Sequence, residues 1–252
     1  MQRLILLSAA LAISVAAWSQ SKPPGESEPN LAPRGGTIPI PDDGYDGTLA
    51  SMACQTVTVG TAGTVEDVDV TAALEHTWVG DLTMKLVSPA GTVATVLSRP
   101  GFADAVDDGT GCCGDSSNLV LTSPITFSTT NGMFDAELMG GTIGGDALVC
   151  QDDGECDFIP NPGSAIDSGD LSALFDGETA AGDWDFCVGD GAGGDTGNLG
   201  AVTLDVTAAA GPPPPPAAPV EVPTLNLYGL LVALGLIGIA GLVTATRRNR
   251  QS

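Results

Sequence analysis

The stretch VDVTAALEHTWVGDLTMKLVSPAGTVATVL, Val68–Leu97, decides the fold class of this protein. Apolar residues recur at every second position in two runs, and a third short apolar run follows. This period places successive side chains on opposite faces of a β-strand. Gly80 and the turn sequence Ser88–Thr92 separate the runs, so the stretch predicts three strands joined by tight turns. Their apolar positions are Val68, Val70, Ala72 and Leu74, then Leu82, Met84 and Leu86, then Val93–Leu97.

Two later segments alternate in the same way, and a Gly-rich loop, Gly189–Asn198, separates them. Short segments of period two that are bounded by Gly, Asp, Asn and Pro turns are typical of antiparallel sandwiches and jelly rolls. The sequence therefore predicts an all-β fold. The apolar positions of these two segments are Trp184, Phe186 and Val188, then Val202, Leu204 and Val206.

Several short motifs follow one another in a fixed order along this body. They are IPIPD at Ile38–Asp42, HTWVGDL at His76–Leu82, SPAGT at Ser88–Thr92, FDG at Phe175–Gly177, GDW at Gly182–Trp184 and GDTGNL at Gly194–Leu199. Together they resemble the P domain, also called the Homo B domain, of proprotein convertases and bacterial subtilisin-like proteases. The resemblance implies a jelly-roll sandwich like that of galactose-binding domains. It also implies a non-catalytic role beside a serine-type endopeptidase. The sequence departs from the family at Val202, where Trp is usual, and in an insert from Pro100 to about Pro160.

His76 is the only histidine of the chain, and it invites a catalytic interpretation. A Ser-His-Asp hydrolase needs a histidine base beside a serine, but no Gly-x-Ser-x-Gly motif accompanies it. The resemblance places a structural histidine here. We therefore expect His76, Trp78 and Trp184 to be structural. His76 should hydrogen-bond the turn, Trp78 should continue the inward-facing row, and Asp81 should accept turn amides.

Calcium is the cofactor that the sequence best suits, because Asp-rich loops supply carboxylate and carbonyl oxygens. Asp81, Asp190 and Asp195 are the candidate ligands. Ordinary Asp-Gly turn chemistry explains the same residues, and the sequence leaves both interpretations open. Zinc is excluded on composition, because the chain has one histidine and no CxxC pair.

The six cysteines are an even number in a chain with an export signal, which indicates disulfides. A bond between the adjacent Cys112 and Cys113 would close a strained ring, so each is expected to find a distant partner. The insert offers Cys150 and Cys156. The sequence thus predicts a Cys54–Cys187 bond and two bridges within the insert.

The chain divides into five segments by composition. Residues 1–19 form an expected signal peptide and 20–36 a flexible leader; 37–208 form the domain, 209–221 a Pro-rich spacer and 222–252 a tail. The alternative for the first segment is a retained anchor. In the tail, residues 225–246 carry no charge and are long enough to cross a bilayer as a helix. The basic residues that follow predict that the C-terminus stays inside and the domain outside.

Val222-Pro223-Thr224-Leu225, one apolar span and an arginine cluster resemble a bacterial exosortase-type sorting tail of the Ile-Pro-Thr-Leu class. The resemblance implies a signal peptidase and an exosortase-type enzyme as processing partners, and delivery to the cell surface. A plain single-pass anchor is the alternative, and whether the tail is cleaved or retained stays open.

The exported part is strongly acidic. It carries four basic and thirty acidic side chains, which give a net charge near −26. Nucleic acid and anionic membrane surfaces are excluded as partners, because both require basic patches. Three functions remain: a surface-displayed accessory or binding module, for example for a surface glycan; an accessory to a separate subtilisin-like protease; and a weak hydrolase with an unrecognised site.

Overall fold

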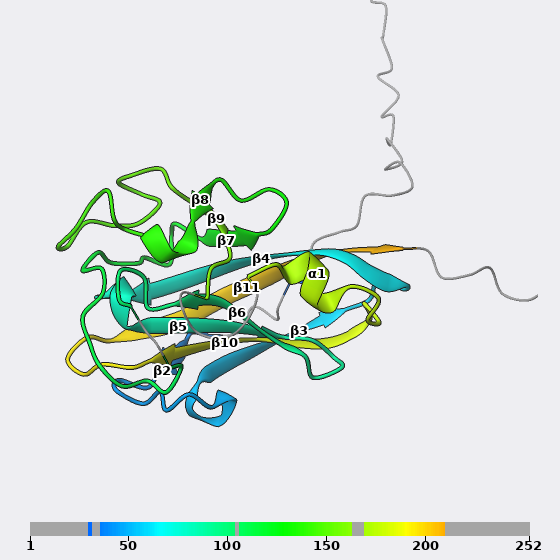
Figure 1. Ribbon diagram of the computed structural model, residues 1–252, viewed down its shortest axis with the longest axis horizontal. Coiled ribbons are helices and arrows are strands. Elements are labelled where there is room, and N and C mark those ends of the chain that lie inside the picture. The colour runs from blue at the N-terminus through cyan, green and yellow to red at the C-terminus, as the bar shows by residue number, and fades with distance from the viewer. Residues whose placement is uncertain (1–29, 32–35, 104–105, 163–168, 210–252) are drawn as a thin grey trace, which may run out of the picture. The chain divides into compact units, whose positions relative to one another are not determined.

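The computed structural model describes residues 30–31, 36–103, 106–162 and 169–209 (Figure 1). The predicted signal peptide, nearly all of the Pro-rich spacer, the Val222–Leu225 motif and the expected helix over residues 225–246 lie outside the described residues. Within the described ranges, no helix is long and apolar enough to cross a membrane.

The described strands form two sheets. The larger sheet has the order β1-β11-β4-β7-β9-β8, and β2 also pairs with β11. Its strands are β1 (Asn30–Leu31), β2 (Ile38–Ile40), β4 (Thr64–His76), β7 (Ile125–Ser128), β8 (Phe134–Asp135), β9 (Asp157–Ile159) and β11 (Gly197–Ala209). The smaller sheet has the order β3-β10-β5-β6, with β3 (Ala53–Val59), β5 (Leu82–Val87), β6 (Val93–Ser98) and β10 (Gly182–Asp190). Helical turns in the described residues are η1 (Leu49–Ser51), η2 (Val79–Asp81), η3 (Ala136–Leu138) and α1 (Leu171–Phe175).

The prediction of an all-β fold is confirmed. Each predicted segment lies within a strand: the two alternating runs of the opening stretch within β4 and β5, its short apolar run within β6, and the later two segments within β10 and β11. The pairs β4–β11, β5–β6 and β5–β10 are antiparallel, as predicted. Alternation succeeds here because the apolar side chains of each strand point into the core, whereas the polar ones point to the other face, even where that face is also covered, as in β5.

The antiparallel prediction is wrong for the insert. There β9 pairs in parallel with both β7 and β8 (Figure 1). Parallel neighbours need a crossover connection of a dozen residues or more, and the long segment between β7 and β9, which contains β8 and η3, supplies it. The strands are too short to show a period, so the sequence could not predict this pairing.

The two sheets share one hydrophobic core. The inward positions of β4 and β11 and those of β5 and β10 belong to the same cluster of buried residues. Trp184 is fully buried within it and lies edge-on against Phe175 of α1, with ring centroids 5.0 Å apart and planes at 81°. The Trp184 Nε1–H donates to the carbonyl of Ala180 at 3.0 Å. Trp184 therefore lies on the inward-facing side of β10, in the core.

A disulfide joins Cys54 of β3 to Cys187 of β10, as predicted. The two residues are direct partners in the register of the antiparallel pair. Cys187 is buried, but not in the main core: it packs in a second cluster with Tyr45 and Met52. The bond therefore lies on the outer face of the smaller sheet, beneath the segment that leads into β3.

The other two bonds correct the prediction. Cys112 bonds to its neighbour Cys113, and Cys150 bonds to Cys156. Two bridges do lie within the insert, but the expectation that Cys112 and Cys113 seek distant partners is wrong. Cys113 has a φ of 80°, in the left-handed region, so the chain turns sharply at this pair. This turn brings the two sulfurs together, even though the residues are neighbours with α-carbons 3.7 Å apart, closer than in most disulfides.

The first loop of the insert is fastened to the domain by two basic side chains. Lys85 of β5 forms an ion pair with Asp107 at 2.5 Å. The fully buried Arg99 donates from its two terminal nitrogens to the carbonyls of Thr110 and Gly111, at 2.6 and 2.5 Å. These contacts hold the chain immediately before the Cys112–Cys113 bond in one place.

Candidate functional site

His76 lies at the end of β4, where it connects the two sheets. Its ring is fully buried, and Nε2 lies 3.1 Å from Oδ2 of the buried Asp190 at the end of β10. Nδ1 lies 2.9 Å from the carbonyl oxygen of Trp78 and 3.2 Å from the Trp78 backbone nitrogen. A strand of the larger sheet and a strand of the smaller sheet are thus joined through one imidazole.

The geometry allows two proton arrangements for the His76 ring. In the neutral ring, an Nε2–H donates to the Asp190 carboxylate and the Nδ1 lone pair accepts the Trp78 N–H. In the charged ring, Nδ1–H donates to the Trp78 carbonyl instead. Either way both nitrogens have partners, and no serine hydroxyl of the described residues bonds to the ring. This arrangement suits a residue that holds a turn, and it leaves no nitrogen to activate a serine.

Trp78 departs from its predicted position. It was expected to continue the inward row of β4, yet it is only half-buried and lies outside the core cluster. The reason is that β4 ends at His76 and the chain turns into η2, so Val79 fills the core in its place. The indole Nε1 is buried and has no hydrogen-bond partner.

The insert covers this turn through backbone hydrogen bonds. His76 and Leu119 exchange two, at 3.2 and 2.9 Å, and the Val79 N–H donates to the Ser117 carbonyl at 2.8 Å. The Gly80 N–H donates to Asp115 at 2.9 Å. A Cβ on Gly80 would lie 2.4 Å from the Asp115 nitrogen, so only glycine allows this approach.

Asp81 is buried, with 3% of its surface exposed, and its Oδ1 has no hydrogen-bond partner. No hydrogen bond from an amide of its own turn to Asp81 is seen among the described residues, whereas Asp190 accepts the Ala192 N–H of the following loop at 3.0 Å. Burial, followed by the negative charges of Asp190 and Asp195, raises the pKa of Asp81 to about 6 against the opposing effect of His76 and Arg99.

We expect Asp81→Asn to stabilise the protein at pH 7 but not at pH 4. Because the folded pKa of about 6 lies above the ordinary value of 3.8, the folded state holds the proton more tightly. Stability should therefore fall as the pH rises between these two values and then level off. The variant lacks this loss and should gain about 2–3 kcal/mol at pH 7. Urea unfolding at pH 4, 5, 6 and 7 measures it, and an unchanged difference across the series would contradict the assignment.

The three predicted calcium ligands lie close enough together for Asp190 and Asp195 to raise the pKa of Asp81. Asp190 is held by His76, and Asp195 Oδ1 accepts the Thr77 hydroxyl at 2.8 Å. In the described part of the chain, no three His, Cys, Asp or Glu side chains are arranged to hold a metal ion.

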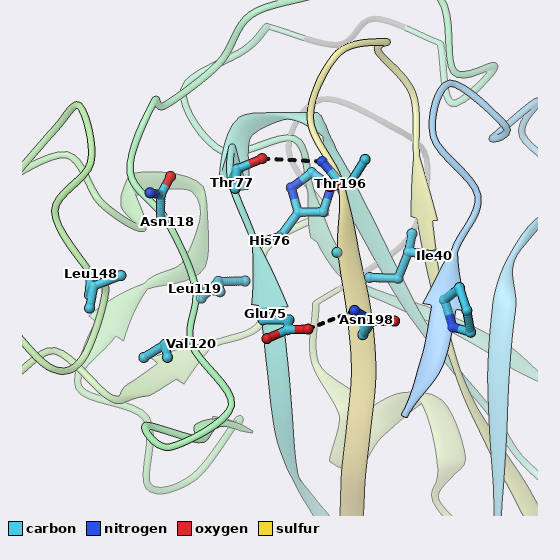
Figure 2. A pocket seen from close by; sticks show the side chains of 12 residues that line it. Ile40, Glu75, His76, Thr77, Asn118, Leu119, Val120, Leu148, Thr196 and Asn198 are labelled. Atoms are coloured by element: carbon cyan, nitrogen blue, oxygen red, sulfur yellow. Dashed lines mark hydrogen bonds between the residues drawn. The ribbon is translucent and has the colours of Figure 1, made fainter. Parts of the chain in front are cut away.

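A groove of about 570 Å³ lies beside the His76 turn (Figure 2). Its floor is the face of β4 and β11 that carries Glu75 and Asn198, whose side chains are joined by an Nδ2–H···Oε1 bond of 2.6 Å. In Figure 2 the insert residues Leu119 and Leu148 lie on one side of these strands and Ile40 of β2 on the other. The groove is thus bounded by segments far apart in sequence, and no local pattern predicts it.

Comparison with known proteins identifies part of this region. Residues 65–111 match the proprotein convertase P-domain. The resemblance carried by the sequence motifs is confirmed over this segment. The P-domain segment contains nearly all of β4, then η2, β5, β6 and the first loop of the insert. His76, Trp78 and Asp81 lie inside it. Asp190, Asp195 and the insert wall of the groove lie outside it.

Two solved structures are similar to the chain over part of their length. One is the serine protease of Aeromonas sobria, with 20% identity, 69% of this chain covered and a TM-score of 0.38. The other is the same protease in complex with its chaperone, with 21% identity, 71% of this chain covered and a TM-score of 0.38. The chain spans about a quarter of each, 25% and 26%. No curated protein matches it.

Proposed function

We propose that this protein is an exported P-domain protein that acts as a non-catalytic accessory or binding module at the cell surface. The observation that carries the proposal is the match of residues 65–111, because it falls on the His76 turn and on strands of both sheets. A jelly-roll topology of the galactose-binding type belongs to the same proposal.

The geometry of the His76 turn supports a non-catalytic role. A general base must reach the proton that it removes, whereas the His76 ring is buried and both nitrogens are engaged. The ring links β4 to β10 through Nε2, and its Nδ1 is bonded to the Trp78 backbone, whereas a hydrolase would need one ring nitrogen beside a serine hydroxyl. The groove beside it, walled by the insert, is the surface through which we propose that the module contacts its partner.

The two chain ends support the proposed location. The apolar N-terminal run, the Pro-rich spacer and the span over residues 225–246 are the features of a chain that is exported and then held at a membrane. We propose that signal peptidase and an exosortase-type enzyme act on it, at residue 19 and near Val222–Leu225.

One expression experiment tests both parts of the proposal. We compare the full chain with a chain that ends at Glu221, both in a Gram-negative host. The full chain should fractionate with membranes and the shortened chain with the soluble periplasmic or secreted protein, because the span is lost. Neither should react with a fluorophosphonate that labels activated serines. A shortened chain that stays in the membrane would overturn the proposed location. Labelling that disappears in His76→Gln while the fold persists would overturn the non-catalytic role.

A second candidate is that the chain assists a separate subtilisin-like endopeptidase. The match to a domain named for the proprotein convertases favours it. This function predicts that adding the purified chain lengthens the half-life of the partner protease at elevated temperature. Val120→Asp, on a partly exposed side chain of the groove wall, should remove the effect, whereas Leu138→Asp, on an exposed side chain elsewhere in the insert, should not.

A further inference from the structure

A second and smaller pocket of about 250 Å³ lies next to the His76 turn. Its walls are Trp78 and Asp81 of the turn, the Cys112–Cys113 disulfide, and Asp195 with the adjoining Ala192-Gly193 backbone. It shares no lining residue with the groove described above. Aromatic, carboxylate and disulfide groups thus face one small space.

Two polar atoms of this pocket's side chains lack partners. Asp81 Oδ1 and Trp78 Nε1 are both buried and form no hydrogen bond. Buried polar groups are nearly always paired, and an unpaired one calls for an explanation such as a missing ligand. The unpaired acceptor is a carboxylate that is 97% removed from solvent, which costs more than an unpaired neutral group. Beside the pocket, Asp81 Oδ1 therefore lacks a donor and Trp78 Nε1 lacks an acceptor.

The charges around the pocket are mainly negative. Asp81 and Asp195 line it, and Asp190 lies behind Asp81 close enough to affect its ionisation. A further carboxylate, that of Asp42, contacts the loop that carries Asp195, where its Oδ1 accepts the Gly194 N–H at 3.0 Å. The nearby cation Arg99 is already bonded to two carbonyls and lies 4.5 Å from the Phe102 ring. This field favours a positively charged ligand.

The shape of the walls selects among cations. An indole face attracts ammonium and guanidinium groups, and a disulfide offers apolar surface for a methylene stem. A bare divalent ion fits less well, since no three carboxylates of the described residues converge. We propose that this pocket binds a guanidinium or primary ammonium group on an unbranched stem, as in an arginine or lysine side chain of a partner polypeptide. The proposal rests on this pocket alone and stands whether or not the chain assists a protease.

Titration of the full purified chain with Nα-acetyl-arginine amide tests the proposal, because Trp78 reports binding by fluorescence. The matched neutral compound is Nα-acetyl-citrulline amide, which has nearly the same shape without the charge. The arginine compound should bind at least about tenfold more tightly, since a charge-assisted hydrogen bond is lost in citrulline. Affinity should fall as salt rises. Calcium chloride and galactose serve as the competing ligands.

Asp81→Asn and Asp195→Asn should each weaken arginine binding about tenfold, by loss of one carboxylate. The matched control is Asp176→Asn, which removes the same charge from an exposed site after α1, near the start of β4; its affinity should be unchanged. Equal binding of citrulline and arginine would overturn the proposal. So would saturation by calcium or galactose that depends on Asp81, or an equal loss in the Asp176 variant.

Discussion

Trp184→Ala should lower the free energy of unfolding by about 3–5 kcal/mol, the usual cost of removing a large buried aromatic side chain. Trp184 is fully buried at the centre of the sandwich and lies edge-on against Phe175. Alanine would leave a cavity between the sheets, remove the aromatic pair and leave the Ala180 carbonyl without its 3.0 Å donor. Urea unfolding followed by circular dichroism measures the change.

Two further variants make this prediction specific. Trp184→Phe keeps an aromatic ring against Phe175 and loses mainly the hydrogen bond, so it should cost less than Trp184→Ala. Trp78→Ala removes an indole of equal size that is half-buried and outside the core, so it should also cost less. A larger loss in the Trp78 variant than in Trp184→Ala would show that the two tryptophans have been assigned the wrong roles.

Removing the Cys54–Cys187 bond by a double change to alanine should cost up to about 4–5 kcal/mol in the chain-entropy model. The two cysteines are 133 positions apart, so the bond constrains most of the unfolded domain. It also joins direct partners in the register of β3 and β10, so the fold itself brings the two cysteines side by side. Unfolding of oxidised protein in urea gives the difference.

The Cys150–Cys156 bond provides the matched comparison, because it closes a loop with a separation of only six. The same double change to alanine there should cost about 2 kcal/mol in the same model. A loss at Cys150–Cys156 that equals or exceeds the loss at Cys54–Cys187 would contradict the argument from loop length. Unfolding of each variant with and without reducing agent shows how much stability the remaining disulfides contribute.

The sequence by itself determined the main strands of the two sheets and the disulfide that joins β3 to β10. Alternation predicted β4, β5, β10 and β11, and a short apolar run predicted β6, because the apolar positions of each strand point into the core. Cys54 and Cys187 could be paired because the other four cysteines lie in the insert. The HTWVGDL and SPAGT motifs carried the P-domain resemblance, which the match of residues 65–111 confirms.

Only the tertiary structure decided how the insert and the site are built. The parallel pairing of β9, the Cys112–Cys113 bond and the partial exposure of Trp78 have no periodic signal in the chain. The bond between His76 and Asp190 joins residues 114 positions apart. The pKa of Asp81 depends on burial and on carboxylates contributed by another segment. Such features arise where distant segments meet, and local sequence records polarity and turn preference but not which segments come together.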